Sequence, residues 1–390
     1  MSNNESTYDY IIAGGGMAGL SLAYKLCKAG LVHKKILILD KEPKTKNDRT
    51  WGFWEQGNSI FDEIAHLQWK AIKIVDYANT STTYPLQKHT YKVIRGLDFY
   101  TFINAYLKKC INVTFVFSDI LEIKEKDKTG FVHCENGTTY SSSYIFDSIS
   151  KLDLSQKGRL HFLQHFYGQV IRFEQDTFDT SAPEMMNYDV TQLAGECRFM
   201  YLIPISKTEA ILEFTLFSEK LLEEVEYKHL LNSYLQKRYK GQPYTVLEEE
   251  FGVIPMSNTD IDIDKNSKII KIGTSAGSTH PATGYTFAAA QKHIDNIVVL
   301  LKNGKSLQNL KQSLSPKHKL YASTLLQVMK NKELAMDQVF IDMFKKNKTD
   351  DVFDFLGGES SFVQELGIMW NTPIIYFGKA FVQSAINNLK

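Results

Sequence analysis

The sequence predicts an α/β fold with three parts: a parallel-sheet unit, an antiparallel-sheet unit and a helical C-terminal region. Three observations support this prediction. Strand and helix patterns alternate over the first forty residues, long period-two strands occupy residues 160–217, and helical patterns prevail over residues 295–390. A length of 390 residues suits two or three structural units.

The chain opens with a strand, a glycine-rich turn, a helix and a second strand. Residues 8–13 form a short apolar run, and residues 20–29 have the periodicity of a helix that stops at Gly30. Residues 36–39 form a second apolar run that ends at Asp40. Such runs are typical of parallel strands buried on both faces, so we expect one βαβ unit.

Shorter elements follow as far as Asp147. Turn signals and periodicity predict, in order, a loop entering a helix at 44–54, a hairpin from 69–75 and 82–86, a helix at 97–108, a strand at 113–117, and a hairpin across 130–144. A short apolar strand that ends at Asp147 closes this region.

The second half of the chain contains a sheet and then a return to the first unit. Residues 198–204 and 210–217 alternate in period two, as strands of an antiparallel sheet do. A short apolar strand at 269–272, a small-residue loop at 273–284 and a helix from residue 285 indicate the return.

Helices are expected over the remainder of the chain. The clearest helical segment is 320–344, and the aromatic stretch 370–381 is predicted to be a core helix rather than one that dips into a membrane. These elements divide the chain into a discontinuous nucleotide-binding domain at 1–60, 90–150 and 250–300, a substrate-binding sheet domain at 61–89 and 151–249, and a helical region able to contact a membrane at 301–390.

The composition is that of an ordinary globular enzyme. Its 45 Lys and Arg against 44 Asp and Glu leave a net charge of +1, which excludes a nucleic-acid binder that relies on a basic surface. Four separated cysteines without metal-ligand spacing predict a reduced, cytoplasmic protein with no metal site. Residues 1–8 lack a basic n-region and no run of about 18 apolar residues occurs, so neither a secretion signal nor a spanning helix is expected.

Basic residues are concentrated near the start of the helical region. Residues 295–350 carry ten Lys against five acidic residues, while the remainder of the chain is net negative. This excess suits either a solvated helix face or contact with an anionic membrane surface.

The turn after the first strand has the glycine spacing of a dinucleotide-binding loop. Gly14 permits the tight turn, Gly16 lets the backbone approach a pyrophosphate, and Gly19 permits close packing of the helix on the strand. Asp40, 21 residues after Gly19, is placed to bind ribose hydroxyls. The predicted cofactor loop is Gly14, Gly15, Gly16, Met17, Ala18 and Gly19.

FAD and NAD both suit such a loop, and the organisation of the chain favours FAD. No second loop of this kind offers a nicotinamide site, and the chain returns to the same sheet after a long insertion. The loop from Gly273 to Gly284, followed by Tyr285, is expected to direct backbone N–H groups and a helix N-terminus at the flavin, which favours a reduced, anionic flavin. The alternative is a glycine-rich connection without a chemical role. We therefore expect a discontinuous, Rossmann-like FAD-binding domain resembling that of the flavin hydroxylases.

Aromatic residues are unusually frequent. They make up 12 % of the chain, as 24 Phe, 20 Tyr and 4 Trp. Residues 47–54 read Asn-Asp-Arg-Thr-Trp-Gly-Phe-Trp and predict either a packed corner or an apolar wall beside a cation, Arg49, that contacts phosphate or flavin. Arg95 is a second candidate for contact with the cofactor.

Several segments resemble, in the same order, those of the bacterial lycopene β-cyclases. The resemblance runs from about residue 8 to about residue 380. It is carried by residues 8–12 with the glycine loop, 47–54, 164–168, 199–204, 212–215 and 280–285.

The resemblance implies an intramolecular lyase or isomerase that closes the acyclic ends of lycopene into β-ionone rings, giving γ-carotene or β-carotene. It also implies reduced FAD, with NAD(P)H as the electron donor and no net oxidation or reduction. Lycopene and other carotenoids would be drawn from a membrane, so the protein is expected to be cytoplasmic and peripherally associated with the membrane. The essential carboxylate of the family maps to Glu213, and many relatives carry a second acid where this chain has Phe214.

The residues around Glu213 support an acid–base role independently. Strand alternation places Glu213 among apolar residues on one face, and desolvation there would raise its pKa toward values useful for a general acid. The alternative is a structural ion pair with Arg172 or Arg198 on a neighbouring strand. The resemblance favours catalysis.

Four other polar residues are weaker candidates. Asp147 is expected to cap a strand end near the flavin, and Asp48 is a candidate partner acid beside Arg49. His165 and His280 are candidate proton carriers, although a single histidine is more often structural.

Three functions remain open from the sequence. The first is the non-redox cyclase, and the second is a redox flavoenzyme of the same fold, either a hydroxylase or an isoprenoid-chain reductase. The third is a flavin-bearing carotenoid-binding protein without turnover. The surplus aromatic residues suit a tunnel that holds a long hydrocarbon and a passing cation.

Overall fold

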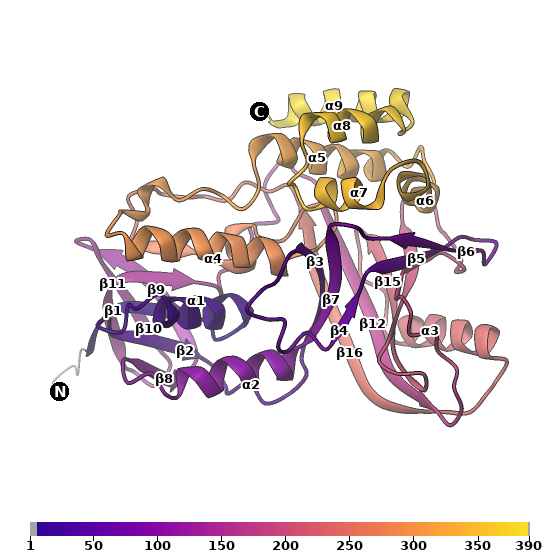
Figure 1. The fold of residues 1–390 in the computed structure, drawn as a ribbon. Helices are drawn as coiled ribbons and strands as arrows, with labels where there is room; N and C mark the ends of the chain where they lie inside the picture. Colours follow the sequence, from indigo (N-terminus) through magenta and orange to yellow (C-terminus); the bar gives the residue numbers. More distant parts are fainter. Residues whose placement is uncertain (1–5, 389–390) are drawn as a thin grey trace.

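The computed structural model describes residues 6–388, whose strands form two seven-stranded sheets and one three-stranded sheet (Figure 1). The first sheet lies at one end of the molecule and the second at the other, and the last helices lie above the second sheet. Residues 1–5 and 389–390, at the outer ends of the first and last predicted parts, lie outside the described residues. The predicted α/β class is confirmed.

The first sheet contains the predicted βαβ unit. Its strand order is β8-β2-β1-β11-β10-β9, with β17 beside β11, and Ile11 of β1 pairs in parallel with Leu37 of β2 and Ile145 of β11. These strands are β1 (Ser6–Ala13), β2 (Ile36–Asp40), β8 (Val113–Phe117), β9 (Ile120–Lys126), β10 (Thr129–Cys134), β11 (Thr139–Asp147) and β17 (Ile269–Lys271).

Helices cover one face of this sheet and a hairpin covers the other. Apolar side chains of β1 and β2 pack against three helices, α1 (Met17–Lys28), α2 (Gly96–Leu107) and α4 (Phe287–Lys302). Val132 and Cys134 of the β9–β10 hairpin pack on Ile11 and Leu37 from the opposite side. Burial on both faces explains why β1 and β2 are continuous apolar runs.

The second sheet is long, largely antiparallel and central to the site. Its strand order is β16-β12-β15-β14-β13-β5-β6. Helix α3 (Glu224–Tyr239) covers the outer face, and the inner face packs toward the third sheet and the C-terminal helices. The strands are β5 (Ala71–Val75), β6 (Ser81–Pro85), β12 (His161–Phe173), β13 (Glu184–Asn187), β14 (Cys197–Pro204), β15 (Glu209–Ser218) and β16 (Tyr244–Ser257).

One predicted domain boundary falls inside a strand. Residue 250 lies within β16, which pairs with β12 as far as Ser257. The second sheet therefore keeps residues 250–257, which the sequence had assigned to the nucleotide-binding domain.

The aromatic segment is a strand, and the prediction of a loop entering a helix at 44–54 is wrong. Residues Thr50–Gln56 form β3, which pairs with β7 (His89–Arg95) in the third sheet, whose other strand is β4 (Leu67–Trp69). Phe53 stacks on Phe287 of α4 with ring centroids 4.4 Å apart. Contacts with a distant helix decide this conformation, and local periodicity does not report them.

The C-terminal region is helical, as predicted, but the clearest predicted segment and the aromatic stretch are each divided. The segment 320–344 contains the end of one helix and most of the next, because Lys332 adopts a left-handed conformation with φ +57°. Pro373 separates the last two helices within 370–381. The helices are α5 (Pro316–Asn331), α6 (Met336–Lys346), α7 (Thr349–Leu356), α8 (Phe362–Trp370) and α9 (Ile374–Asn388).

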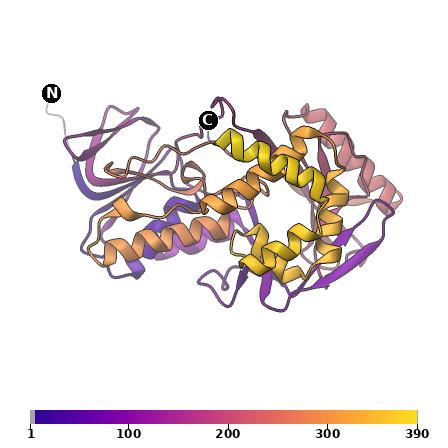
Figure 2. The ribbon, with the colours of Figure 1, turned by 90° about the horizontal axis from the view of Figure 1, so that it is seen from above.

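The stretch 370–381 is not a core helix, which corrects the prediction. Trp370 is 78 % exposed and Ile375 is 83 % exposed. Figure 2, seen from above, shows α8 and α9 at the surface of the molecule, beside α5. Among the helices of residues 6–388, none combines the length and the apolar character needed to cross a membrane.

Candidate active site

A cavity of about 480 Å³ lies between the first and second sheets. Gly16 of the glycine loop borders one part of it, and Glu213 on the inner face of the second sheet borders another. Trp51 and Tyr91 from the third sheet and Tyr285 before α4 complete the wall. The cavity therefore joins the predicted nucleotide loop to the predicted catalytic residue.

The glycine loop has the geometry of an anion site. Gly14 has φ +104°, and a Cβ on Gly19 would lie 2.0 Å from the carbonyl oxygen of Gly14, so both positions require glycine. A Cβ on Gly16, the N-cap of α1, would meet no atom within 4 Å. Met17 and Ala18 follow as the first turn of the helix. The free space at this helix N-terminus suits a pyrophosphate.

Asp40 holds the loop in place. Its Oδ2 accepts a hydrogen bond of 2.6 Å from the backbone N–H of Gly15, and its Oδ1 lies 3.3 Å from Nζ of Lys44. The carboxylate of Asp40 can accept further hydrogen bonds, so it is suited to bind a ribose hydroxyl, as its sequence spacing from the glycine loop predicts.

The two predicted arginines have different surroundings. Arg49 lines the cavity and donates a hydrogen bond of 2.5 Å to the carbonyl oxygen of Asp48. Arg95 forms an ion pair with Glu248 of β16 instead of lining the cavity. Arg49 is therefore the arginine that the structure places beside the cofactor space.

The loop 273–286 closes the cavity from the side of α4. Gly273 has φ +64°, and a Cβ there would lie 2.8 Å from Cβ of Ala18. Gly284 has φ +72°, and a Cβ there would lie 2.0 Å from Oε1 of Gln164. The helix that follows begins at Phe287, two residues later than predicted. Both glycines thus allow the loop to pack closely on residues that border the cavity.

Two buried polar atoms at the cavity have no hydrogen-bond partner among the described residues. They are Oε1 of Gln164 and Oγ1 of Thr283, and both residues line the cavity. Buried polar groups are rarely left unsatisfied, so these atoms indicate a polar ligand. Together with the glycine loop and Asp40, they fit an FAD whose flavin ring has hydrogen-bonding edges.

Glu213 lies on the inner face of the second sheet, as strand alternation predicts. On β15 it pairs with Tyr201 of β14 and with Gly168 of β12. Its side chain is 8 % exposed, and among residues 6–388 it has no hydrogen-bond or ion-pair partner. Burial, followed by the nearby charge of Glu250, raises the pKa of Glu213 to about 8.

The alternative of a structural ion pair at Glu213 is excluded. Arg172 is bound to Glu209 at 2.6 Å, and Arg198 is bound to Glu196 at 2.6 Å. A carboxyl that is buried without a cation keeps its proton near neutral pH, which is the state required of a general acid.

Phe214, where many relatives carry a second acid, lies on the face of β15 opposite to Glu213. The outer face of β15 carries Phe214, which packs with Leu231 of α3 and is buried. Adjacent residues on a strand point to opposite faces, so an acid at position 214 would lie under α3 and away from the cavity.

The weaker candidates take structural positions. Oδ1 of Asp147 accepts hydrogen bonds of 3.0 Å from two backbone N–H groups, which confirms it as a strand-end cap. Asp48 accepts a hydrogen bond of 2.8 Å from the hydroxyl of Tyr100. His165 lies toward α3, where its Nε2 is 2.8 Å from Oγ of Ser218. Burial lowers the pKa of His165 to about 4, so this ring is neutral.

His280 borders the site from the other side. It lies half-buried between two further cavities, and burial lowers its pKa to about 4. Its Nδ1 accepts a hydrogen bond of 3.3 Å from the backbone N–H of Ala282, which shapes the loop before α4.

Sequence reasoning missed the partners that surround Glu213. They are Gly168, Tyr91, Tyr201 and Glu250, all contributed by strands other than β15. A single glycine within a long strand often marks a place where another group approaches the backbone closely. Gly168 was therefore the one residue whose sequence context could have indicated these partners. Glu250 lies in a run of three glutamates that reads as a solvated surface.

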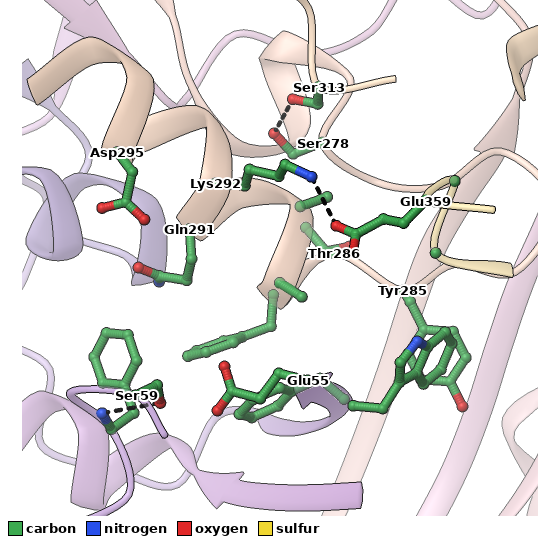
Figure 3. Close-up of a pocket in the computed structure, with 18 of the residues that line it drawn as sticks. Glu55, Ser59, Ser278, Tyr285, Thr286, Gln291, Lys292, Asp295, Ser313 and Glu359 are labelled. Carbon is green, nitrogen blue, oxygen red and sulfur yellow. Dashed lines mark hydrogen bonds and ion pairs between the residues drawn. The ribbon is translucent and has the colours of Figure 1, made fainter. Parts of the chain in front are cut away.

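A larger cavity, of about 1090 Å³, lies beyond Tyr285 and Phe287 (Figure 3). Its polar groups are partly paired, since Lys292 of α4 binds Glu359 at 2.8 Å. Phe53 and Trp54 of β3 and Phe353 of α7 form its apolar side. Tyr285 borders both this cavity and the one at Glu213, so an elongated ligand has room on either side of that residue.

A third cavity, of about 320 Å³, lies among α5, α8 and α9 and is lined mainly by apolar side chains. His280 borders both this cavity and the larger one. The three cavities therefore form a series from the exposed C-terminal helices to Glu213.

The fold places the chain in a structural class. Its Rossmann-like sheet and its second, antiparallel sheet share a cavity, and solved structures of similar fold include flavin-dependent enzymes. A geranylgeranyl bacteriochlorophyll reductase-like protein from Thermoplasma acidophilum is similar with a TM-score of 0.68 and 12 % identity, over 97 % of this chain and 100 % of that chain. A flavin-dependent brominase is similar with a TM-score of 0.59 and 14 % identity, over 90 % and 94 %.

Within that class, comparison of sequences identifies the family. The family model described as lycopene cyclase protein matches residues 9–381, and the chain belongs to this family. The chloroplastic lycopene beta cyclase of Nicotiana tabacum is 24 % identical over 322 residues, which cover 77 % of this chain and 62 % of the relative. The chloroplastic neoxanthin synthase of Solanum lycopersicum is 25 % identical over 304 residues, which cover 74 % and 59 %. The chain thus spans about three fifths of the length of these relatives, and the predicted family is confirmed.

Proposed function

We propose that the protein is a lycopene β-cyclase, which converts the acyclic ends of lycopene into β-ionone rings without net oxidation or reduction. The observation that carries this proposal is the buried, unpaired carboxyl of Glu213, placed in a cavity that continues to a dinucleotide-binding loop. Membership of the lycopene cyclase family supports the substrate class.

Glu213 would act as the general acid of this reaction. A raised pKa keeps its carboxyl protonated near neutral pH, so it can protonate a terminal double bond of the substrate. A second double bond then captures the cation and closes the ring, and loss of a proton restores charge neutrality. The rings of Tyr91, Tyr201 and Tyr285 line the same cavity, and a π face directed at the cation would stabilise it.

FAD would be held by the glycine loop, Asp40, Arg49 and the loop 273–286. The pyrophosphate would lie at the N-terminus of α1, and Gln164 and Thr283 would bind the polar edges of the ring. When bound and reduced, the flavin supplies negative charge that stabilises developing positive charge on the substrate. NAD(P)H is the proposed electron donor that keeps the flavin reduced.

A redox flavoenzyme is the second candidate, because a reductase-like protein shares this fold over nearly the whole chain. A hydroxylase or an isoprenoid-chain reductase would oxidise one nicotinamide for each product molecule. The cyclase needs reductant only to reduce its flavin, so product formed greatly in excess of nicotinamide consumed would reject the redox reaction.

The proposed location is the cytoplasmic surface of a membrane, where the hydrocarbon substrate resides. Exposed apolar side chains gather on α8 and α9, beside the apolar cavity among α5, α8 and α9. The lysine-rich stretch 295–350 lies just before them in the chain and suits anionic headgroups. An amphipathic surface of this kind binds a bilayer without crossing it.

The decisive experiment is expression of the chain in cells that accumulate lycopene, followed by analysis of the pigments. We expect γ-carotene, β-carotene or both in place of lycopene. The matched control is Glu213→Gln, which should retain FAD and form product at a rate about 10²- to 10⁴-fold below that of the parent. Unchanged lycopene beside soluble, FAD-loaded protein would reject the proposal, and activity that survives in Glu213→Gln would reject the assigned acid.

A further inference from the structure

A row of four residues crosses the inner face of the second sheet. Tyr201 of β14 pairs with Glu213 of β15, Glu213 pairs with Gly168 of β12, and Gly168 pairs with Glu250 of β16. Residues in register on neighbouring strands point to the same face. Glu213 and Glu250 are therefore on one face, two strands apart, and both border the cavity.

Gly168 is the residue between the two carboxyl groups. A Cβ at this position would lie 2.5 Å from Cγ of Glu213 and 3.2 Å from the carbonyl oxygen of Leu212. The side chain of Glu213 thus leans over the glycine toward β16. Neighbouring strands lie about 4.8 Å apart, so the two Cα atoms are separated by roughly 10 Å, a gap that two glutamate side chains and a substrate carbon can fill.

Burial raises the pKa of Glu250 above its ordinary value, but hydrogen bonds that Glu213 lacks oppose this rise. Oε1 of Glu250 accepts a hydrogen bond of 3.2 Å from the backbone N–H of Thr50, and its Oε2 accepts one of 2.9 Å from the hydroxyl of Thr50. The nearby positive charges of Arg49 and Arg95 act in the same direction. Glu213 has no such hydrogen bonds, so a proton shared by the pair resides on Glu213.

We propose that Glu250 is the second carboxylate of the catalytic site: it shares one proton with Glu213 across Gly168 and accepts the proton that the cyclised cation releases. This inference rests on the proposed cyclase function. Glu213 gives its proton to a terminal double bond, a carbon–carbon bond forms as the second double bond attacks the cation, and a C–H bond breaks as Glu250 takes a proton. Return of that proton to Glu213 restores the pair, so no net proton or electron is consumed.

Other charged and titratable groups face the pair from several elements. Arg49 and Thr50 approach from the segment that begins β3, Arg95 from the end of β7, and Glu248 from β16, where it is paired with Arg95. Three phenols complete the surroundings, contributed by Tyr91, Tyr201 and Tyr285. Burial raises the pKa of all three, so they remain neutral while the pair titrates.

The kinetic test compares Glu250→Gln with Glu249→Gln in the purified, flavin-loaded chain. Glu249 is the adjacent residue on the opposite face, where it accepts a hydrogen bond of 2.6 Å from Tyr167, so it is a matched control. Loss of the Glu250 charge should lower the pKa of Glu213. We expect a rate at least tenfold lower and an alkaline limb of the pH–rate profile moved down by about one unit. Glu250→Asp should restore part of the rate, and Glu249→Gln should match the parent.

A second measurement requires neither substrate nor turnover. The pKa of Glu213 is raised to about 8 from an ordinary value of 4.5, so the folded protein binds a proton that the unfolded chain releases. The free energy of unfolding should therefore decline as pH rises between these two values. In Glu250→Gln this decline should end at a lower pH, and Glu213→Gln should remove most of it. Thermal unfolding midpoints of the apoprotein between pH 5 and pH 9 report both effects.

Two results would overturn the inference. A Glu250→Gln variant with the parent rate and pH profile would show that Glu213 donates and recovers the proton alone. A variant that loses rate while both its alkaline limb and its unfolding profile match the parent would show a structural role only. If the parent chain forms no cyclic product, the proposed function fails, whereas the unfolding profiles still decide whether the two carboxyls share a proton.

Discussion

The hydroxyl oxygens of Tyr201 and Tyr285 lie 3.2 Å apart, and this contact joins the second sheet to the loop that precedes α4. Tyr201 is also the strand neighbour of Glu213. Tyr201 is buried and Tyr285 is half-buried, and burial raises the pKa of both phenols. They therefore surround the acid with neutral polar and aromatic groups but give it no counter-charge. The same contact therefore lies at the border of the cavity beside Glu213 and adds no positive charge there.

The pH dependence of turnover should follow the protonation of Glu213. Because burial and Glu250 raise its pKa to about 8, the acid form predominates below that pH and is lost above it. We expect the rate to be nearly constant from about pH 6.5 to about pH 7.5 and to fall tenfold per pH unit well above 8. A pH–rate profile at saturating substrate checks this, and an alkaline limb near pH 5 would contradict a desolvated acid.

Gly168→Ala should impair catalysis by displacing the acid. The new Cβ would lie 2.5 Å from Cγ of Glu213, so that side chain must move away from its position over β12. We expect the rate to fall by about 10 to 100-fold with FAD content unchanged, since small displacements of reacting groups are costly.

The matched control for this change is Gly367→Ala in α8, where a Cβ would meet no atom within 4 Å. It should keep the parent rate. Equal activity of the Gly168 and Gly367 variants would show that the position of Glu213 over Gly168 is unimportant.

Gly16→Asp should separate flavin binding from folding. Gly16 is the N-cap of α1, its φ of −82° is open to any residue, and a Cβ there meets no atom within 4 Å. Aspartate is a favourable N-cap, so the apoprotein should unfold at the parent temperature or slightly above. Its charge would repel a pyrophosphate, and we expect at least a tenfold loss of FAD in the purified protein, measured by flavin absorbance.

The control for added charge is Gly367→Asp, a position with equal free space and no predicted contact with the cofactor. It should purify with the parent FAD content. Full flavin loading of Gly16→Asp would contradict the assignment of this loop to the pyrophosphate.

Trp370→Asp and Ile375→Asp should weaken binding to membranes. These side chains are 78 % and 83 % exposed on α8 and α9, beside the apolar cavity. Loss of each apolar contact and the added negative charge should reduce sedimentation with anionic phospholipid vesicles several-fold. Ile111→Asp alters another exposed apolar residue, between α2 and β8, and should leave binding unchanged. Equal losses in all three variants would indicate a general charge effect rather than a docking face.

Prediction from sequence succeeded where local patterns carry the information. The βαβ unit, the glycine loop with Asp40 and the alternation that turns Glu213 inward all depend on residues close together in the chain. It failed at residues 44–54 and 370–381. There, packing of β3 on α4 and exposure of α8 and α9 decide the outcome, and neither has a local signature.

The sequence by itself determined the family, and it also predicted the nucleotide loop and the acid that we propose. Only the tertiary structure decided what surrounds that acid, because strand register brings together residues far apart in the chain. Glu213 and Glu250 meet across Gly168 because β15 and β16 both pair with β12. The pKa of Glu213 depends on burial without an ion-pair partner and on the nearby charges of Glu250 and Arg95. These likewise result from packing of separate segments and cannot be read from any one of them.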